Sequence, residues 1–482
     1  MKILFINPSK MGSGYTPIWI ASHYPLLKKN GHSVEFFDCC LYEDWTDQYI
    51  EENTKSGMYL PSDYFNMVQL NQNDLLVDLQ NEIDTFAPDV IFWSAISSHI
   101  HSEGEYVNIQ YGYDLLINIS HNAKLITGGI QATAEPNKIL ELFPQIDILI
   151  RGESEFVLLE LLKDISNFQS VNGISYKRDG SLICNPPQEI ISDLDVLEPY
   201  DYSLFTPNVL LRPYNGKVYK TVDYELSRGC PYSCAYCVET VIQKYYSLES
   251  NKGVLKNPKR YLRNKSAKRI FFELKTLSEK HGVEFIRAQD TNFLTINRKV
   301  LNELASLIQE SDLKIFFYIE TRPENINSEK VVELLKKLKV DGVAMGIESG
   351  IESFREEELN RFVKQEKIIR AFKMLKDAGI RRTSYNILGL PGETQEMLHS
   401  SIKLNAEIKP DNISTSYFSP YIGTPLFDKL NETTKFNYIY DLDDGLRYLT
   451  PQTTDLSASL VEFYRKNFKS LVENGIENID KN

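Results

Sequence analysis

The sequence has few cysteines, few histidines and no excess of positive charge. Its 482 residues include 6 cysteines and 7 histidines, and 53 Lys and Arg residues are set against 66 Asp and Glu residues, for a net charge of −13. A nucleic-acid partner is not expected, because binding to phosphates needs a basic surface. The chain also has no run of about 18 uncharged apolar residues, which argues against a membrane-spanning helix.

The N-terminus lacks the features of a secretory signal. The chain opens as a strand, Lys2–Asn7, without a basic segment, an apolar segment and a cleavage site in series. We therefore expect a cytoplasmic protein, in which disulfide bonds are rare and cysteines more often bind metals or act in catalysis. A chain of 482 residues predicts two or three domains.

Strand-like apolar runs alternate with helix-like segments over the first 160 residues. This alternation is typical of βαβ units in a buried parallel sheet, and it predicts an α/β fold with a doubly wound, Rossmann-like or flavodoxin-like domain over residues 1–160. A ligand of such a domain binds outside the carboxyl ends of the strands. The expected strands are Ile3–Asn7, Ser33–Asp38, Asp89–Ala95, Lys124–Thr127 and Ile146–Ile150.

The carboxyl ends of these expected strands are rich in small and polar residues. Gly128 and Gly129 follow the fourth strand, and Gly152 follows the fifth. Glycine at such a position lets the backbone approach a ligand closely, although ordinary βα turns are the alternative. Gly12 and Gly14 after the first strand lack the third glycine of the dinucleotide-binding motif, so that function is not indicated.

Residues 161–222 are expected to connect two domains. Asp179-Gly180 and Asn215-Gly216 are typical of two-residue hairpin turns. A second alternation of strands and helices predicts a partial (β/α)6 barrel over residues 223–425, with its chemistry at the carboxyl ends of the strands. We expect a short helical region over 426–482. The expected barrel strands are Tyr224–Arg228, Glu284–Ala288, Lys314–Ile319, Gly342–Ile347, Thr383–Leu388 and Ile413–Phe418.

Three of the six cysteines, Cys230, Cys234 and Cys237, lie close together in the sequence. Their Cys-x-x-x-Cys-x-x-Cys spacing lets three thiolates meet one small metal centre from a single loop. A structural zinc site needs four ligands, and the nearest downstream histidine is His281. A cubane 4Fe–4S cluster held by three thiolates leaves one iron free for a substrate or cofactor. Burial in an apolar core is the alternative, and the proline, tyrosines and serine between the cysteines argue against it.

This segment resembles the signature of the radical S-adenosylmethionine (SAM) superfamily, in which three cysteines follow the first barrel strand. Later strand ends resemble the superfamily as well: Asp290–Phe293, Gly346–Gly350, Asn386–Glu393 and Tyr417–Pro420. In that family the open iron binds SAM, and reductive cleavage of SAM yields methionine and a 5′-deoxyadenosyl radical. The resemblance implies SAM contacts at Tyr236, Asp290, Arg322, Glu348, Ser349 and Tyr417.

Two of these residues have a simpler alternative role. For Glu348 the alternative is an ion pair with Arg322 or Arg287, whereas a structural pair would explain Arg322 as well as a cofactor contact would. Asp290 is better explained by a ligand, because a bound ammonium group needs an acceptor or an anion nearby.

A doubly wound domain ahead of such a barrel resembles the cobalamin-binding class of radical SAM enzymes. Gly128–Gln131 and Arg151–Glu155 are similar to that class's Gly-Gly-x-His and Arg-Gly-Glu-x-Glu segments, with Gln131 in place of the histidine. The Asp-x-His-x-x-Gly motif, which supplies a histidine to cobalt in many cobalamin proteins, is absent. No histidine is therefore expected below the cobalt, although His99 and His101 follow the third strand. The resemblance implies cobalamin contacts at Ser94, Ser97, Thr127, Gly128, Gly129, Gly152 and Glu153.

The resemblance implies a cobalamin-dependent radical SAM methyltransferase that acts on an unactivated carbon, or on phosphorus, of a small molecule. In this class cobalamin carries a methyl group from one SAM, and a second SAM supplies the radical that abstracts hydrogen from the substrate. The expected partners are the small-molecule substrate and an external one-electron donor such as flavodoxin or ferredoxin.

Three alternatives stay open. A radical SAM cyclase, rearrangement or oxidation catalyst would use the same architecture without methyl transfer. A methylthiotransferase is disfavoured because such enzymes place three cysteines in the first domain, where this chain has only Cys39 and Cys40. A non-catalytic iron–sulfur binding module is the alternative from another class, and the motifs at the later strand ends argue against it. No further cysteines follow the barrel, so no auxiliary cluster is expected.

Overall fold

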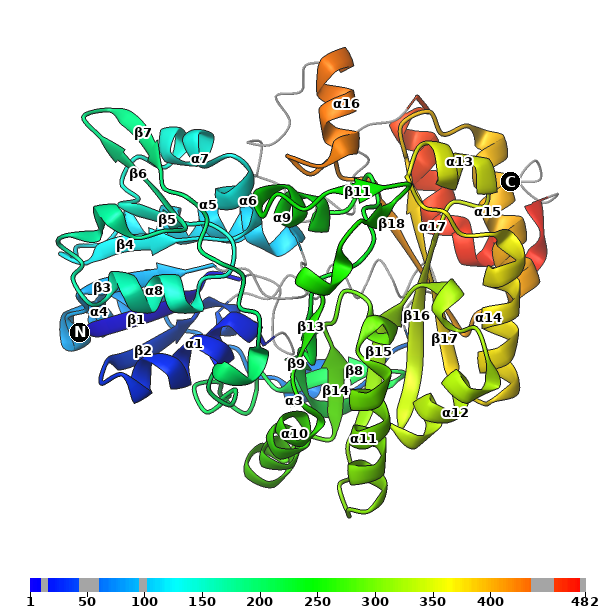
Figure 1. Ribbon diagram of the computed structural model, residues 1–482, viewed down its shortest axis with the longest axis horizontal. Coiled ribbons are helices and arrows are strands. Elements are labelled where there is room, and N and C mark those ends of the chain that lie inside the picture. The colour runs from blue at the N-terminus through cyan, green and yellow to red at the C-terminus, as the bar shows by residue number, and fades with distance from the viewer. Residues whose placement is uncertain (10–15, 43–59, 95–101, 435–454, 477–482) are drawn as a thin grey trace.

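The computed structural model describes residues 1–9, 16–42, 60–94, 102–434 and 455–476. Within them, two large β-sheets lie side by side, each covered by helices (Figure 1). One apolar core is continuous between them and includes Phe5 and Phe92 of the first sheet and Val222 and Ile286 of the second. The two domains therefore pack on one another through buried apolar side chains.

The first sheet has the strand order β2-β1-β3-β4-β5-β6-β7. Strands β1 to β5 pair in parallel, and the hairpin β6–β7 is added in antiparallel orientation beside β5. The order of β1 to β5 is that of flavodoxin-like sheets, which confirms the predicted doubly wound fold. The strands are β1 (Lys2–Asn7), β2 (Ser33–Asp38), β3 (Val90–Trp93), β4 (Lys124–Thr127), β5 (Ile148–Ile150), β6 (Ile174–Arg178) and β7 (Ser181–Cys184).

Helices cover both faces of the first sheet. Ile3 and Phe5 of β1 share an apolar cluster with α1 and α8, whereas Leu4 and Ile6 share another with α4 and α5. Because successive strand residues point to opposite faces, this burial on both sides explains the uninterrupted apolar run of β1. The helices are α1 (Ile18–Lys29), α3 (Tyr64–Met67), α4 (Leu75–Phe86), α5 (Ser102–Leu116), α6 (Ile130–Ala134), α7 (Pro136–Leu142) and α8 (Glu155–Leu161).

The second sheet has the order β18-β17-β16-β15-β14-β9-β8 and forms the predicted open, partial barrel. Strands β9 and β14 to β18 pair in parallel, and β8 closes one edge in antiparallel orientation. Its strands are β8 (Leu211–Tyr214), β9 (Lys217–Tyr224), β14 (Phe285–Ala288), β15 (Phe316–Thr321), β16 (Val340–Glu348), β17 (Arg381–Leu388) and β18 (Asn412–Tyr417). Two small pairs accompany it: β10 (Ser227–Arg228) with β13 (Arg263–Asn264), and β11 (Ser250–Asn251) with β12 (Val254–Leu255).

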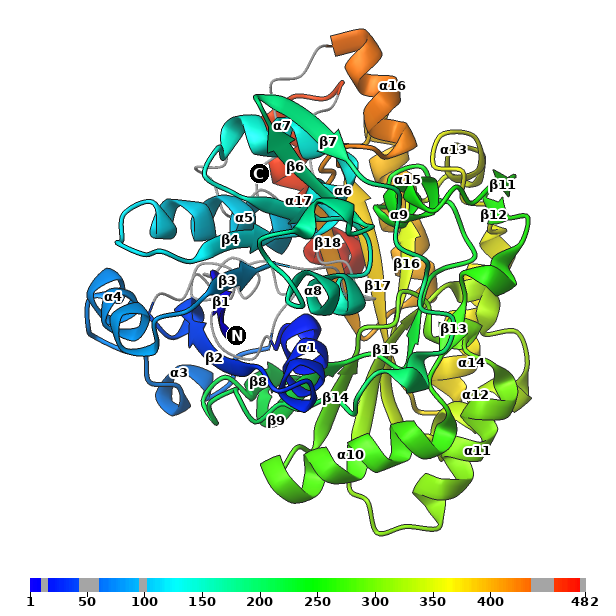
Figure 2. The same ribbon diagram turned by 60° about the vertical axis from the view of Figure 1, so that its left-hand side comes forward.

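Helices cover the outer face of this curled sheet, as Figure 2 shows for α10, α11, α12 and α14. At the far end, α17 packs on α15 and β18, and its Tyr464 and Phe468 are fully buried there. The helices are α9 (Glu239–Tyr245), α10 (Ala267–His281), α11 (Arg298–Gln309), α12 (Glu329–Lys337), α13 (Glu352–Glu357), α14 (Gln365–Asp377), α15 (Gln395–Ile408), α16 (Pro425–Thr434) and α17 (Ala458–Asn474).

The region expected to connect the domains, residues 161–222, is divided between the two sheets. Its hairpins β6–β7 and β8–β9 turn at the two predicted dipeptides, where Asp179, Gly180, Asn215 and Gly216 all have φ between 50° and 78°. These angles are those of the turn that Asp-Gly and Asn-Gly favour. The first hairpin extends the first sheet and the second hairpin joins the second sheet, so no separate linker domain exists in this region.

Within the described residues, no helix combines the length and the apolar character needed to cross a membrane.

Candidate functional site

The cysteine loop follows β10 and ends at α9, beside the carboxyl ends of the barrel strands. Gln243 of α9 holds it in place: its side chain donates to the carbonyls of Cys230 at 3.1 Å and Tyr232 at 2.9 Å and accepts from the Ser233 hydroxyl. At Gly229, φ is +90° and an added Cβ would overlap the carbonyl oxygen of Tyr261. Only glycine fits where the chain enters the loop.

The thiols of Cys230 and Cys234 are buried and that of Cys237 is half-buried. No three His, Cys, Asp or Glu side chains in the described ranges converge closely enough to hold a single metal ion. A cubane cluster spreads its irons over a larger volume than a single metal ion and takes thiolates that lie further apart. Cys40 and Cys184 lie in the first domain, after β2 and at the end of β7.

Arg322 reaches the cysteine loop from the end of β15. Its guanidinium donates to the sulfur of Cys234 at 3.6 Å and lies 3.8 Å from the ring centroid of Tyr232. Its Nε also lies 2.6 Å from Glu324. Arg322 thus lies beside the cysteine loop and also makes a structural ion pair, which was the alternative to a SAM contact.

Tyr236, Glu348 and Arg361 form a buried group where β16 ends. The Tyr236 hydroxyl donates to Oε1 of Glu348 at 3.0 Å, and the Arg361 guanidinium lies 3.9 Å from the same oxygen. Burial raises the pKa of Glu348, and the charge of Arg361 opposes that rise. The alternative partners Arg322 and Arg287 do not pair with it, since Arg287 pairs with Glu320 at 3.6 Å. Sequence reasoning missed Arg361, because it lies on the loop after α13 and carries no recognisable spacing.

The backbone at the end of β16 has an unusual shape that places the Glu348 carboxylate. Glu348 has φ of +63°, in the left-handed region that non-glycine residues rarely adopt, and the pairing of β16 with β17 shifts register there. A Cβ on Gly346 would overlap Oε1 of Glu348. Strained backbone of this kind is concentrated at functional sites.

Asp290 follows β14 and lies beneath the segment that leads into the cysteine loop. Its carboxylate accepts from the backbone N–H of Leu226 at 3.2 Å and from the Ser227 hydroxyl at 2.5 Å, and it is fully buried. Burial raises its pKa to about 7 despite these bonds. The carboxylate therefore supports the loop segment, a role different from the SAM contact expected from the sequence.

Asn292, in the same Asp290–Phe293 segment, is the better candidate for a ligand contact. Its Oδ1 accepts from Thr321 at 2.7 Å and from Asn325 at 2.9 Å. Its Nδ2 is buried and has no hydrogen-bond partner in the described part of the chain. A buried amide N–H without a partner is costly, which favours an acceptor from a bound molecule.

The sequence predicted a SAM contact at Tyr417, but the side chain of Tyr417 lies on the face of the sheet that α15 and α17 cover. Tyr417 lies in the apolar cluster formed by β18, α15 and α17, and the guanidinium of Arg465 is 5.3 Å from its ring centroid. Alternation along β18 turns the next residue, Phe418, toward the cysteine loop, where it clusters with Ala235. Ser349 is fully buried and its hydroxyl accepts from the N–H of Ile351 at 3.4 Å, so it shapes the turn after β16.

Four of the cobalamin candidates gather at the carboxyl ends of β3 and β4. The hydroxyl of Thr127 donates to the carbonyl of Trp93 at 2.6 Å, and Gly128 is packed so that an added Cβ would lie 2.9 Å from the Ile150 carbonyl. Gly129 and Ser94 both have positive φ, at 106° and 59°. These residues therefore shape the backbone at the strand ends. Ser97, His99 and His101 lie outside the described residues.

Gln131 lies at the same sheet edge, on α6. It is 1% exposed, and neither its Oε1 nor its Nε2 has a hydrogen-bond partner within the described residues. An amide buried with both polar atoms unpaired loses more free energy than its packing returns, unless a polar molecule satisfies it. Gln131 is the side chain here that most clearly indicates a polar ligand.

Gly152 and Glu153 have a different role from the one expected. An added Cβ at Gly152 would lie 2.5 Å from the hydroxyl of Tyr246, the residue after α9, so this glycine allows the barrel domain to pack closely. The carboxylate of Glu153 pairs with Arg263 at 2.7 Å and accepts from the N–H of Ile191. The end of β5 therefore faces the barrel domain, because Tyr246 and Arg263 of that domain contact Gly152 and Glu153.

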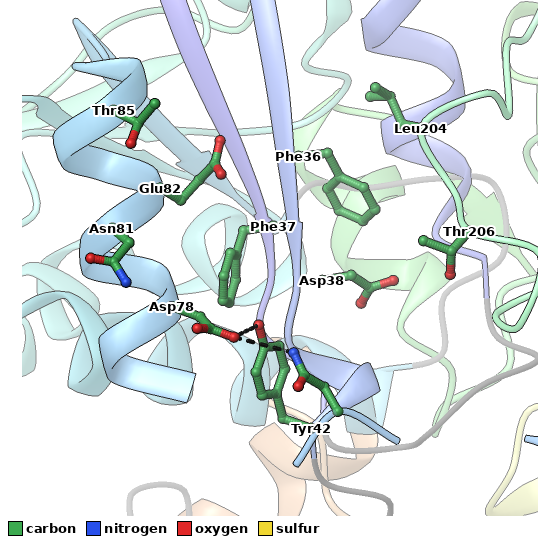
Figure 3. A pocket seen from close by; sticks show the side chains of 11 residues that line it. Phe36, Phe37, Asp38, Tyr42, Asp78, Asn81, Glu82, Thr85, Leu204 and Thr206 are labelled. Atoms are coloured by element: carbon green, nitrogen blue, oxygen red, sulfur yellow. Dashed lines mark hydrogen bonds between the residues drawn. The ribbon is translucent and has the colours of Figure 1, made fainter. Parts of the chain in front are cut away.

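A separate cavity of about 410 Å³ lies beside the edge strand β2 and helix α4 (Figure 3). Asp38, Asp78 and Glu82 line it, and Asp78 accepts from the hydroxyl of Tyr42 at 2.9 Å. Burial raises the pKa of Asp38 to about 6, and its Oδ2 has no partner within the described residues. None of the residues expected to bind a cofactor lines this cavity.

Comparison with known proteins agrees with this geometry. Residues 224–404 match the Radical SAM superfamily. Anaerobic magnesium-protoporphyrin IX monomethyl ester cyclase from Rubrivivax gelatinosus is 25% identical over 459 residues, which cover 91% of this chain and 73% of the relative. Cytidylyl-2-hydroxyethylphosphonate methyltransferase from Streptomyces wedmorensis is 21% identical over a region that covers 93% of this chain and 84% of the relative. The solved structure of the radical SAM methyltransferase TsrM from Kitasatospora setae, with cobalamin and a 4Fe–4S cluster bound, has a TM-score of 0.65 at 17% identity and covers 96% of this chain and 81% of its own.

Residues 224–404, which form the partial barrel, are thus a Radical SAM superfamily domain. The fold of the whole chain, a doubly wound domain followed by a partial barrel, is that of the TsrM structure.

Proposed function

We propose that this chain is a cobalamin-dependent radical SAM methyltransferase that acts on carbon or phosphorus of a small molecule. The observation that carries the proposal is the position of the cysteine loop relative to the first domain. Helix α9, which follows Cys237 directly, packs on α6, which carries Gln131 at the ligand-facing edge of the first sheet. Groups held by the loop and by this edge would be neighbours, as the transfer of a methyl group requires.

The residues of the loop fit an iron–sulfur cluster. Cys230, Cys234 and Cys237 would supply three thiolates from one loop, and Gln243 fixes the backbone between them. The Arg322 guanidinium beside Cys234 would hold positive charge next to the thiolates and so stabilise the negative charge of the site. The cluster and SAM supply the one-electron radical chemistry of the superfamily when bound, and cobalamin supplies a carrier for the methyl group.

The residues beside the loop fit the polar end of SAM. Tyr236, Glu348 and Arg361 would orient a ligand next to the cysteines, since their positions are fixed by mutual hydrogen bonds and charge pairing. The unpaired Nδ2 of Asn292 would donate to a carboxylate. We propose these four residues as the SAM contacts, together with Arg322.

The first domain fits a ligand rich in amide groups. Gln131 presents both an N–H donor and a carbonyl acceptor without partners, and a carboxamide on the ligand would satisfy both at once. Cobalamin carries several carboxamide side chains on the rim of its ring. We propose that Gln131, Thr127, Gly128, Gly129 and Ser94 form the part of the cobalamin site that lies in the described residues.

A cyclase is the second candidate, because the relative from Rubrivivax gelatinosus is named a cyclase and aligns with 91% of this chain. Labelled SAM separates the two functions without knowledge of the substrate. The protein is reconstituted anaerobically with iron, sulfide and hydroxocobalamin, reduced, and given SAM labelled in its methyl group. A methyltransferase is expected to move the labelled methyl group to the protein-bound cobalamin. A cyclase is expected to form 5′-deoxyadenosine without transfer of the labelled methyl group to cobalamin. Absence of both products would contradict the proposal.

A further inference from the structure

The short segment between β9 and the cysteine loop is anchored by both domains. It runs from Glu225 to Arg228, and Arg228 is two residues before Cys230. Its side chains and backbone make buried polar contacts on two sides, one toward the first domain and one toward the barrel. The position of the first cluster cysteine depends on where this segment lies.

On the side of the first domain, Arg228 meets three carboxylates. Its guanidinium lies 2.5 Å from Glu155, 2.8 Å from Glu225 and 3.6 Å from Glu153, and its side chain is only 4% exposed. Glu153 and Glu155 belong to the first domain, at the start of α8, whereas Glu225 belongs to the same segment as Arg228. A planar guanidinium binds carboxylates in a defined geometry, so these pairs fix Arg228 relative to the first domain.

On the side of the barrel, two further contacts hold the segment. The carboxylate of Asp290 accepts from the N–H of Leu226 and the hydroxyl of Ser227, and β10 pairs with β13. Arg263 of β13 binds Glu153 at 2.7 Å, which links this pairing back to the first domain. The segment is therefore held between the two domains and is attached to each.

The charges in this group depend on one another. Burial raises the pKa of Glu155, but the charge of Arg228, the neighbouring His23 and the hydrogen bonds to the carboxylate together lower it to about 2, so this carboxylate is ionised at neutral pH. Glu155 makes the shortest contact of Arg228 with the first domain, whereas Glu225 belongs to the same segment as Arg228. Loss of the Glu155 charge would therefore leave Arg228 paired mainly within its own segment, and the hold of the first domain on the loop after it would weaken.

We propose that Arg228 is a positioning residue through which the docked first domain sets the position of the cysteine loop. The two glutamates of the Arg-Gly-Glu-Ser-Glu segment, Glu153 and Glu155, then act on the cysteines through Arg228. The expected effect on the iron–sulfur cluster rests on the proposed function, since it assumes that Cys230 holds iron. The expected effect on the position of the loop does not depend on the proposed function.

Hydrogen exchange of the full-length protein without cofactors tests the proposal independently of the cluster. Glu155→Gln keeps the shape of the side chain and removes its charge, and Asp411→Asn breaks the pairing with Arg382 at the opposite end of the barrel as a matched control. We expect at least tenfold faster exchange in the peptide covering residues 229–238 for Glu155→Gln, a smaller increase for Arg228→Lys, which keeps one charge, and none for Asp411→Asn. Unchanged exchange in this peptide would overturn the proposal, as would an equal increase in peptides from β15 to β17.

Iron analysis after anaerobic reconstitution extends the test to the cluster. Glu155→Gln is expected to retain less than half of the iron of the unchanged protein, and Arg228→Lys is expected to retain more than Glu155→Gln. Full iron in Glu155→Gln would contradict the role in positioning the cluster ligands. An unchanged protein that binds no iron would contradict the proposed function instead, and the exchange result would still decide the role of Arg228.

Discussion

The hydroxyl of Tyr236 donates a hydrogen bond to Oε1 of Glu348 at 3.0 Å and so joins the cysteine loop to the end of β16. Arg361 donates to the same hydroxyl at 3.4 Å and to the carbonyl of Gly346 at 2.6 Å. The place of the Glu348 carboxylate therefore depends on the loop, on Arg361 and on the absence of a side chain at Gly346.

Gly346→Ala is expected to weaken SAM binding to the reconstituted protein by roughly tenfold or more, about 1.4 kcal/mol. The added Cβ would overlap Oε1 of Glu348 and push the carboxylate away from Tyr236. Anaerobic isothermal titration calorimetry with SAM measures the change. Iron content is the control and should be unchanged, because Gly346 does not touch the cysteines. An unaltered affinity for SAM would place Glu348 outside the site.

Replacement of Cys230, Cys234 and Cys237 together by alanine is expected to abolish cluster absorption. The unchanged protein should bind about four irons per chain if one cubane is present. Cys39→Ala, Cys40→Ala and Cys184→Ala are the controls, since these cysteines lie in the first domain. Full cluster iron in the triple variant, or loss of iron in a control variant, would show that the ligands are assigned incorrectly.

Gln131→Leu is expected to weaken the binding of hydroxocobalamin by roughly five- to thirtyfold, which corresponds to about 1–2 kcal/mol for two lost hydrogen bonds. The substitution keeps the size of the side chain and removes both polar atoms. Absorbance titration measures the affinity. Gln145→Leu, the same change at an exposed position, should have no effect. Equal affinity in both variants would remove Gln131 from the cobalamin site.

Asp290 is expected to make the stability of the protein without cofactors depend on pH. Burial raises its pKa from 3.8 to about 7, so between these values the folded state holds a proton that the unfolded state has lost. Stability therefore falls as the pH rises through this window, by an amount on the order of a few kcal/mol. Asp290→Asn lacks the titrating group and should show a flatter pH dependence.

Thermal unfolding at pH 5 and pH 8 tests this expectation. The midpoint of the unchanged protein, relative to that of Asp290→Asn, should be lower at pH 8 than at pH 5. The same difference at both values would mean that Asp290 does not carry the proton.

Much of the fold follows from local features of the sequence. Strands β3 and β5 of the first sheet are buried on both faces and are apolar throughout, and the Asp-Gly and Asn-Gly dipeptides at 179–180 and 215–216 adopt the expected turns. The cysteine spacing is also recognisable in the sequence, and Arg322 lies beside the cysteines because residues at parallel strand ends meet at one edge of a sheet.

The remaining features depend on tertiary packing. The orientation of Tyr417 was predicted wrongly because a shift of one residue along a strand moves a side chain to the other face. Gly152 and Glu153 lie at a strand end, where a ligand site is expected. The packing of the barrel domain on this strand end places α9 and Arg263 there instead, and the sequence does not indicate that packing. Arg361 was missed because a long loop brings it to Glu348, and such a contact has no sequence spacing.

The central claim is that one chain holds a 4Fe–4S cluster on the cysteine loop and cobalamin on the first domain. Iron and cobalt measured in the same sample, after anaerobic reconstitution with both cofactors and removal of excess reagents by gel filtration, test it most directly. The account predicts about four irons and about one cobalt per chain, with cobalt reduced in Gln131→Leu and iron lost in the triple cysteine variant. Full iron with no retained cobalt would contradict it, because the first domain would then hold no methyl carrier.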